Sequence, residues 1–294
     1  MSGITQETKG MWLGVLGIAM FSLTLPFTRI AVLEIDPVLV ALGRAVVAAA
    51  CAVLLLWWRG AAFPTAGQTR SLLITAGGVV IGFPVFMSIA MHYAPASHGA
   101  IVLGILPLLT ALVAALRFGE RPSAGFWIAA LCGSGLVIAF ALQQGGGQLH
   151  PADLAMFAAV LLAAMGYAEG ARLAQTMGGP VVISWALVLA MPLVLPATIA
   201  LIWRHGVHAS PIAWLSFGYV SLFSMFIGFF FWYRGLALGG IARVGQVQLI
   251  QPFLTLLASM LLLGEQLELS QFLFAFAIIA VVAIGRKMPV KRQS

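Results

Sequence analysis

Charged side chains are scarce in this chain. Asp, Glu, Lys and Arg make up 8% of the 294 residues, whereas 62% are hydrophobic, and the mean hydropathy is +1.07. In ordinary soluble domains about a quarter of the residues are charged. The composition therefore excludes a water-soluble protein and predicts a chain whose solvent is largely lipid.

Cysteine is nearly absent too. Cys51 and Cys132 are the only two, and each falls inside a long hydrophobic run. Two isolated cysteines at lipid depth have no metal-ligand spacing. We interpret both as small apolar residues rather than as a disulfide or a metal pair.

A nucleotide-binding motif is also absent. The sequence contains no GxxxxGK[ST] segment, and its hydrophobic runs leave no room for a soluble domain that could hold ATP. We therefore predict neither an ATPase subunit nor a cofactor. The few acids at lipid depth are scattered, which disfavours a membrane enzyme, and rings of polar residues that would line a channel are not apparent.

Long hydrophobic runs dominate what is present. About 20 apolar residues are needed for a helix to cross the hydrocarbon core of a bilayer. Lipid admits only helices or closed barrels, and these runs are too long and too evenly apolar for barrel strands. We predict an all-α membrane protein with ten transmembrane helices. They cover residues 11–29, 37–58, 71–91, 95–116, 123–142, 152–173, 180–203, 211–233, 241–263 and 269–285.

Basic residues are distributed unevenly between the predicted loops. With ten spans, both ends of the chain lie on one side of the membrane, and only Arg29 and Arg204 lie near the other side. The side with both ends carries Lys9, Arg59, Arg70, Arg117, Arg121, Arg172, Arg234, Arg243, Arg286, Lys287, Lys291 and Arg292. The positive-inside rule therefore predicts cytoplasmic termini, in the inner (plasma) membrane of the cell. The lipid bilayer explains the net charge of +7 without any nucleic acid partner.

The two halves of the sequence resemble each other. Residues 107–120 read PLLTALVAALRFGE and residues 252–265 read PFLTLLASMLLLGE, with 7 of 14 positions identical. Near the start of each half, Arg29 and Pro37 correspond to Arg172 and Pro180 at almost the same offset. We therefore predict two repeats of five helices each, over residues 1–147 and 148–294.

Five is an odd number, so the second repeat must enter the membrane upside down relative to the first. Inverted repeats are typical of transporters, because two similar units that exchange conformations can open a midplane site to either side. A channel or a membrane enzyme gains no comparable benefit from this symmetry. The repeat therefore predicts alternating access to a small-molecule solute.

The repeated motif also resembles a known family. A helix with a central proline that ends in Gly-Glu, seen here as Pro107 with residues 119–120 and Pro252 with residues 264–265, is similar to the ten-helix EamA-type exporters of the drug/metabolite transporter superfamily. Arg44 matches the basic position that this family tends to have early in its second helix, although Leu187 replaces it in the second half. The resemblance implies export of small metabolites.

Within that family the chain also resembles the YddG-type exporters of aromatic amino acids. This likeness implies export from cytoplasm to periplasm. We therefore predict a small neutral or zwitterionic solute, with aromatic or hydrophobic amino acids as the leading candidates. A hydrophobic cation or drug, or another metabolite, is the alternative.

Polar side chains follow one stripe of the predicted ninth helix. At spacings of three and four residues lie Gln248, Gln251, Thr255 and Ser259. The corresponding positions of the fourth helix hold Leu103, Leu106, Thr110 and Ala114. A stripe in only one half favours contact with the solute. Hydrogen bonding between helices is the alternative, and both interpretations stay open.

Large side chains supply further candidates for a solute cavity. They are Phe83, Met87, Tyr167, Trp185, Phe226 and Phe230. Each one alone could equally pack against a neighbour or face lipid, so the hypothesis concerns the set.

Two prolines lie in the middle of predicted helices. Pro107 and Pro252 each remove an amide donor and leave a carbonyl one turn earlier without its usual partner, so we expect a kink at both. Because the kink occurs in both halves, we interpret it as a hinge. A static bend satisfied by a neighbouring helix is the alternative.

Ionisable groups inside the predicted spans need partners. Glu169 and Arg172 share a helical face, which favours a structural ion pair, with proton coupling or binding of a solute amine as the alternative. Arg44 is interpreted as reaching outward towards Glu34 or Asp36, with the outer vestibule as the alternative.

Other ionisable residues lie near predicted helix ends. Glu120 and Glu265 precede the next helix and are expected to cap it. His92 and His98 flank a short outer loop, where solvated histidines are expected.

Overall fold

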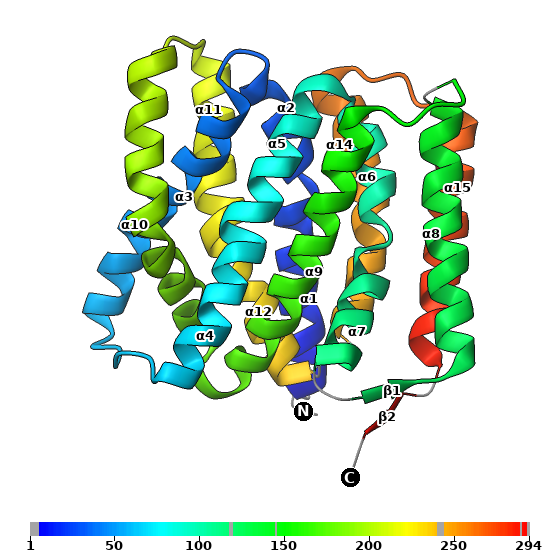
Figure 1. Ribbon diagram of the computed structural model, residues 1–294, viewed down its shortest axis with the longest axis horizontal. Coiled ribbons are helices and arrows are strands. Elements are labelled where there is room, and N and C mark those ends of the chain that lie inside the picture. The colour runs from blue at the N-terminus through cyan, green and yellow to red at the C-terminus, as the bar shows by residue number, and fades with distance from the viewer. Residues whose placement is uncertain (1–5, 118–119, 145, 240–243, 289, 293–294) are drawn as a thin grey trace, which may run out of the picture.

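The computed structural model describes residues 6–117, 120–144, 146–239, 244–288 and 290–292 (Figure 1). Within these ranges the protein is helical except for one antiparallel pair of three-residue strands, β1 (Glu120–Pro122) and β2 (Val290–Arg292). Eight helical spans are long and apolar enough to cross a membrane, and two shorter apolar helices, Val247–Leu263 and Leu269–Gly285, follow them. These ten segments match the ten predicted runs, although residues 241–243 of the ninth lie outside the described ranges.

The eight long spans contain one to three helical segments each. In chain order the elements are α1 (Gln6–Ser22), α2 (Thr24–Val32), α3 (Pro37–Trp58), α4 (Ala66–Thr75), η1 (Ala76–Gly82), α5 (Phe83–Tyr93), α6 (Ala96–Leu103), α7 (Leu106–Arg117), α8 (Ala124–Gln144), α9 (Pro151–Met177), α10 (Gly179–His205), α11 (Pro211–Tyr219), η2 (Val220–Ile227) and α12 (Gly228–Gly239). The two shorter helices contain η3 (Gly245–Ile250), α14 (Gln251–Leu263) and α15 (Leu269–Lys287).

Local sequence explains where the helices begin and end. Asp36 accepts a hydrogen bond from the Leu39 amide at 2.9 Å and precedes Pro37, so α3 starts with both a side-chain cap and a proline that needs no amide partner. Ser210 caps α11 in the same way. Gly264 ends α14 in the left-handed region, with φ of 65°, where a side chain would be strained.

Both predicted proline kinks coincide with interruptions of a helix. The fourth span breaks between α6 and α7, and Pro107 is the second residue of α7. In the ninth, the 3-10 segment η3 gives way to α14, whose second residue is Pro252. Proline alone does not cause such a break, since α10 continues as one helix through Pro192 and Pro196.

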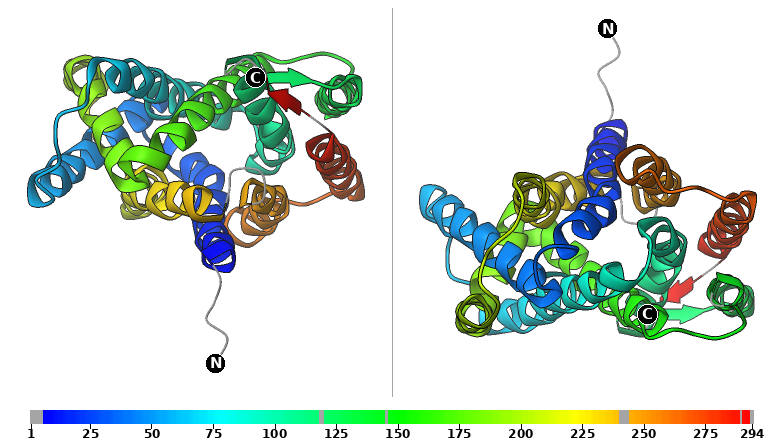
Figure 2. Two further views of the ribbon diagram at one scale, coloured as in Figure 1. Left: turned by 90° about the horizontal axis from the view of Figure 1, so that it is seen from below. Right: turned by 90° about the horizontal axis from the view of Figure 1, so that it is seen from above.

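The helices form a bundle in which neighbours in space are often distant in sequence. α1 packs along α12, α3 along α10, and α9 lies beside α4, α5 and α7. α8 and α15 lie side by side at one edge of the bundle (Figure 2). α1 begins and α15 ends at the same end of the bundle (Figure 1), which we call the terminal end, and the opposite end the distal end.

Polar contacts between helices hold the distal end together. The Glu34 carboxylate accepts hydrogen bonds from the Ser210 amide at 2.6 Å and the Ser210 hydroxyl at 2.7 Å. Both bonds lower the pKa of Glu34, and the bond from the hydroxyl contributes more than the bond from the amide. Arg29 donates to the backbone carbonyls of Met91 and His92, the latter at 2.8 Å. The distal loops are thus joined to one another by ionic and backbone groups.

Glu265 caps a helix of the other half of the chain. Its two carboxylate oxygens accept the amides of Ala96 at 2.8 Å and Ser97 at 2.9 Å, which are the first residues of α6. The expected cap on the following helix is therefore wrong for this residue, since α15 is capped by Glu268. The side chain of Glu120 lies outside the described residues.

We expect Glu265→Gln to lower the free energy of unfolding by about 1 kcal/mol, because a neutral amide oxygen cannot replace a carboxylate that accepts two helix-terminal amides. Thermal unfolding in detergent measures the effect. Glu268→Gln is the matched control, because Glu268 caps α15 from an exposed position. A glutamine there can still accept a hydrogen bond from a backbone amide. Equal losses in the two variants would contradict this assignment.

Candidate functional site

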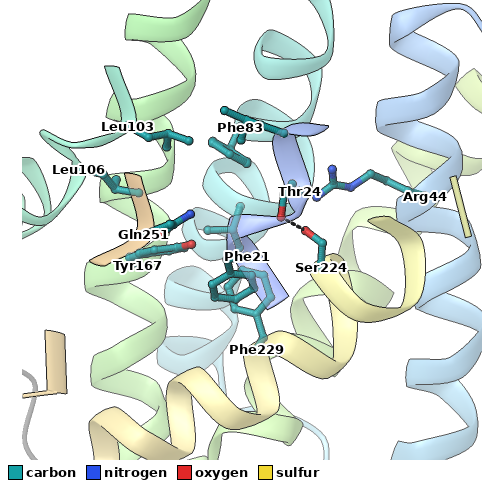
Figure 3. A pocket seen from close by; sticks show the side chains of 12 residues that line it. Phe21, Thr24, Arg44, Phe83, Leu103, Leu106, Tyr167, Ser224, Phe229 and Gln251 are labelled. Carbon is teal, nitrogen blue, oxygen red and sulfur yellow. Dashed lines mark hydrogen bonds between the residues drawn. The ribbon is translucent and has the colours of Figure 1, made fainter. Parts of the chain in front are cut away.

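A small cavity lies in the middle of the bundle (Figure 3). Its volume is about 20 Å³, which is about the room that one water molecule needs. The lining residues are Phe21, Thr24, Leu25, Arg44, Val79, Phe83, Leu103, Leu106, Tyr167, Ser224, Phe229 and Gln251. They come from helices along the whole chain, so the cavity depends on the complete bundle rather than on one local motif.

Interrupted helices place several of the lining side chains. Thr24 begins α2, directly after the turn at Leu23 that separates it from α1. Ser224 lies in the π-helical segment η2, and Gln251 is the first residue of α14 after η3. Irregular backbone inside a membrane is tolerated where it is buried in protein or borders a cavity, as it is here.

A hydrogen bond joins the two halves of the chain at the cavity wall. The hydroxyls of Thr24 and Ser224 are 2.8 Å apart (Figure 3). One hydroxyl proton lies between the two oxygens, so the second can be donated into the cavity. Gln251 and Tyr167 add an amide and a phenol on the opposite side, and the remaining wall is aromatic and aliphatic.

Arg44 borders the cavity as a buried cation. Only 3% of its surface is exposed, and within the described residues its Nε has no hydrogen-bond partner. The expectation that Arg44 reaches outward to Glu34 or Asp36 is therefore wrong: Glu34 pairs with Ser210, and Asp36 caps α3. A buried charge without a partner destabilises a protein by about 3–5 kcal/mol, so an arginine kept in this position indicates a functional role.

The structure brings part of the predicted set of site residues together. Phe83, Tyr167, Gln251 and Arg44 all line the cavity. Met87 is buried one turn after Phe83, without lining the cavity itself. Pro107 and Pro252 are buried next to the lining residues Leu106 and Gln251.

The polar stripe of the ninth helix makes no hydrogen bond to another helix among the described residues. Ser259 donates to the Thr255 carbonyl within α14 at 2.9 Å. The amide nitrogen of Gln248 and the hydroxyl of Thr255 are buried without a partner in the described part of the chain. This pattern disfavours interhelical hydrogen bonding as the reason for the stripe.

Three predicted aromatic residues lie away from the cavity lining. Trp185 is buried against Phe63, with ring centroids 5.2 Å apart. Phe226 packs edge to face on Phe230 at 4.6 Å. Phe230 borders a separate groove of about 770 Å³ near the terminal end, formed by α1, α10 and α12 together with Arg59.

Some lining residues were not predicted. Phe21, Thr24, Ser224 and Phe229 lie in uniformly apolar runs, where no periodic pattern distinguishes an inward face. Leu103 and Leu106 did carry a signal, because they correspond in the repeat to Gln248 and Gln251. At the second of these positions of the repeat, the apolar copy Leu106 and the polar copy Gln251 thus both line the cavity.

Two polar contacts connect the fourth span to α9, one on each side of its break: a hydrogen bond of His98 and an ion pair of Arg117. At the distal end His98 Nε2 is 2.7 Å from Asp153 Oδ1, and both side chains are buried. At the terminal end Arg117 donates from Nε to Glu169 at 2.7 Å. The expected solvated His98 is therefore wrong, and the described partner of Glu169 is Arg117, on another helix, while Arg172 lies one turn further along α9.

Among the described residues, no group of three or more His, Cys, Asp or Glu side chains is placed to hold a metal ion. The cavity lining likewise contains no Cys, His or carboxylate. The groups that remain can bind a solute by charge, hydrogen bonds and aromatic contact.

Known families, proteins and structures resemble this chain. The EamA-like transporter family matches residues 8–141 and residues 150–285. The chain is 44% identical over 284 residues to the uncharacterized transporter YdeK of Bacillus subtilis (strain 168), covering 97% of this chain and 99% of the relative. A crystal structure that is 18% identical, covering 95% of this chain and 96% of its own, superposes with a TM-score of 0.65, which shows a shared fold.

Proposed function

From the premise that the chain belongs to the EamA-like transporter family, and is thus a multi-pass membrane transporter, we propose the function in finer detail. The protein exports a small neutral or zwitterionic metabolite, with aromatic or hydrophobic amino acids as the leading candidates. It works by alternating access in the cell inner membrane. The solute and the lipid bilayer are its partners, without nucleic acid or an ATPase subunit.

The architecture we propose is two inverted repeats of five helices, over residues 1–147 and 148–294, with both termini in the cytoplasm. The family matches twice, once in each repeat. The cavity lining draws on both, since Arg44 and Phe83 belong to the first and Tyr167 and Gln251 to the second. The terminal end, which carries the excess of basic residues, is the cytoplasmic end in this proposal.

The observation that carries the proposal is the small central cavity that both repeats line. At about 20 Å³ it is too small for any amino acid, so helices must move apart to admit one. Alternating access supplies such a movement, because it opens a midplane site to one side of the membrane at a time. Phe21, Phe83 and Phe229 supply the apolar wall for a ring.

The same lining disfavours the rival solute. A hydrophobic cation needs a carboxylate in the cavity, and the lining contains a cation instead. Glu169, the candidate acid for contact with a solute amine, is paired with Arg117. A membrane enzyme is disfavoured by the family and by a lining that has no catalytic cluster.

Counterflow of labelled L-phenylalanine into proteoliposomes tests the proposal. We expect uptake in the wild type and about 5- to 30-fold loss in Gln251→Ala, because an amide that contacts the solute contributes about 1–2 kcal/mol. Gln144→Ala, at an exposed helix end, is the matched control. If neither phenylalanine nor any other amino acid exchanges, the proposed solute class is wrong.

A further inference from the structure

Arg44 is the buried charge that the bundle leaves without compensation. Each acid whose side chain the structure describes already has its own partner. Glu34 binds Ser210, Asp36 the Leu39 amide, Asp153 His98, Glu169 Arg117, Glu265 the amides of α6, and Glu268 Ser270. In the part of the chain that the structure describes, no hydrogen bond or ion pair reaches the guanidinium of Arg44. The missing negative charge must therefore come from outside these residues.

The guanidinium is aimed at the solute cavity. Figure 3 shows Arg44 reaching from α3 towards the Thr24–Ser224 pair, with Gln251 and Tyr167 across the cavity. An arginine stays protonated even when it is buried, so burial does not remove the charge. Its planar fork matches the two oxygens of a carboxylate, and the spare hydroxyl proton of the Thr24–Ser224 pair lies on the same side.

We propose that Arg44 binds the carboxylate of the transported solute, which makes a carboxylate on an apolar or aromatic body the required substrate chemistry. This inference rests on the proposed function, and it names the solute group that the site selects. A single cation suits one negative charge. A phosphate or sugar nucleotide would bring more charge than one arginine and an otherwise apolar wall can balance.

The geometry also assigns the parts of the solute to parts of the cavity. The carboxylate lies between Arg44 and the Thr24–Ser224 pair. The apolar body lies against Phe21, Phe83 and Phe229, and an amino group, where the solute has one, meets the Gln251 carbonyl or the Tyr167 phenol. Amines that lack a carboxylate leave Arg44 unpaired and gain no such contact.

Binding is tested first, without any need for transport. Purified protein in detergent is melted with 3-phenylpropionate, 3-phenylpropanamide or phenethylamine, which share one aromatic body. We expect only the carboxylate to raise the melting temperature, because a ligand stabilises the state it binds. Arg44→Gln should lose this shift, whereas Arg204→Gln, an exposed arginine at the distal end, should keep it.

Folding of the variant is checked in the same measurement. Arg44→Gln removes an unpaired buried charge, so without ligand it should melt no lower than the wild type. Arg44→Lys retains the charge but not the fork, and should bind the carboxylate more weakly than the wild type and more tightly than Arg44→Gln. Comparing the three probes on the wild type tests the inference without any variant. Equal shifts by the amide and the carboxylate would overturn the inference.

Counterflow then separates this inference from the proposed function. Carboxylates should compete with labelled L-phenylalanine about 10- to 100-fold better than the amide or the amine, and Arg44→Gln should abolish that difference. If the carboxylate stabilises the protein but nothing is transported, the proposed function fails and the site stands. If transport occurs with equal competition by amine and carboxylate, the function stands and the role of Arg44 is refuted.

Discussion

Gly78→Val should abolish the accumulation of folded protein in the membrane. Gly78 lies in η1 where it crosses α9, and a Cβ built on it would lie 2.7 Å from the backbone nitrogen of Gly166 and nearer still to the Leu162 carbonyl oxygen. Backbone atoms in the middle of a helix cannot rotate aside as a side chain can. Overpacking costs about 1–3 kcal/mol where side chains can yield, so the cost here should exceed that range.

The preceding residue offers a closely matched control. Gly77 is in the same π-helical segment but is exposed, and a Cβ on it would meet no atom within 4 Å. Gly77→Val changes helix propensity and side-chain volume as Gly78→Val does, without touching α9. Size-exclusion chromatography of detergent-solubilised protein should therefore recover a monodisperse peak for Gly77→Val and aggregate for Gly78→Val. Similar peaks for both would refute the close approach of η1 to α9.

The prediction of the fold from sequence succeeded where one physical effect dominated. Each apolar run is long enough to cross lipid, and an isolated backbone at that depth has no alternative to a helix. Helix ends were less accurate, because a helix can continue beyond the hydrocarbon. α4 begins at Ala66 rather than at residue 71, and α9 continues to Met177 rather than ending at residue 173.

The candidate site was less predictable, because a sequence gives the face of a helix and not its neighbour. Arg44 and His98 were expected to reach water, since both lie near distal helix ends. The structure instead buries Arg44 at the cavity and His98 against Asp153, on a helix 55 residues later in the chain. Where the repeat compared equivalent positions, as for Gln251 and Leu106, the sequence did indicate which face turns inward.

The two polar contacts between the fourth span and α9 can control how the cavity opens. Asp153 and Glu169 lie 16 residues apart on α9, which is about 24 Å along a helix and spans most of the bilayer core. His98 and Arg117 contact them from opposite sides of the break between α6 and α7. Each half of the interrupted span can therefore separate from α9 while the other half remains attached.

Glu169→Gln should open the cavity towards the terminal end. The variant removes the charge that holds Arg117, and because the Arg117 side chain is 43% exposed, the released cation can be solvated. A charged hydrogen bond is worth about 1.5–3 kcal/mol, so the population open at that end should rise about 10- to 100-fold. Ser224→Cys, on the cavity wall, reports the opening when Cys51 and Cys132 are replaced by alanine.

The side from which the cysteine reacts is the decisive measurement. With a membrane-impermeant thiol reagent on the terminal side, Glu169→Gln should accelerate labelling of Ser224→Cys, whereas Asp153→Asn should accelerate it only from the distal side. Asp153→Asn is the matched control, because it weakens the pair on the other half of the same broken span. If both variants increased labelling from the same side, the two pairs could not be closing opposite ends of the cavity.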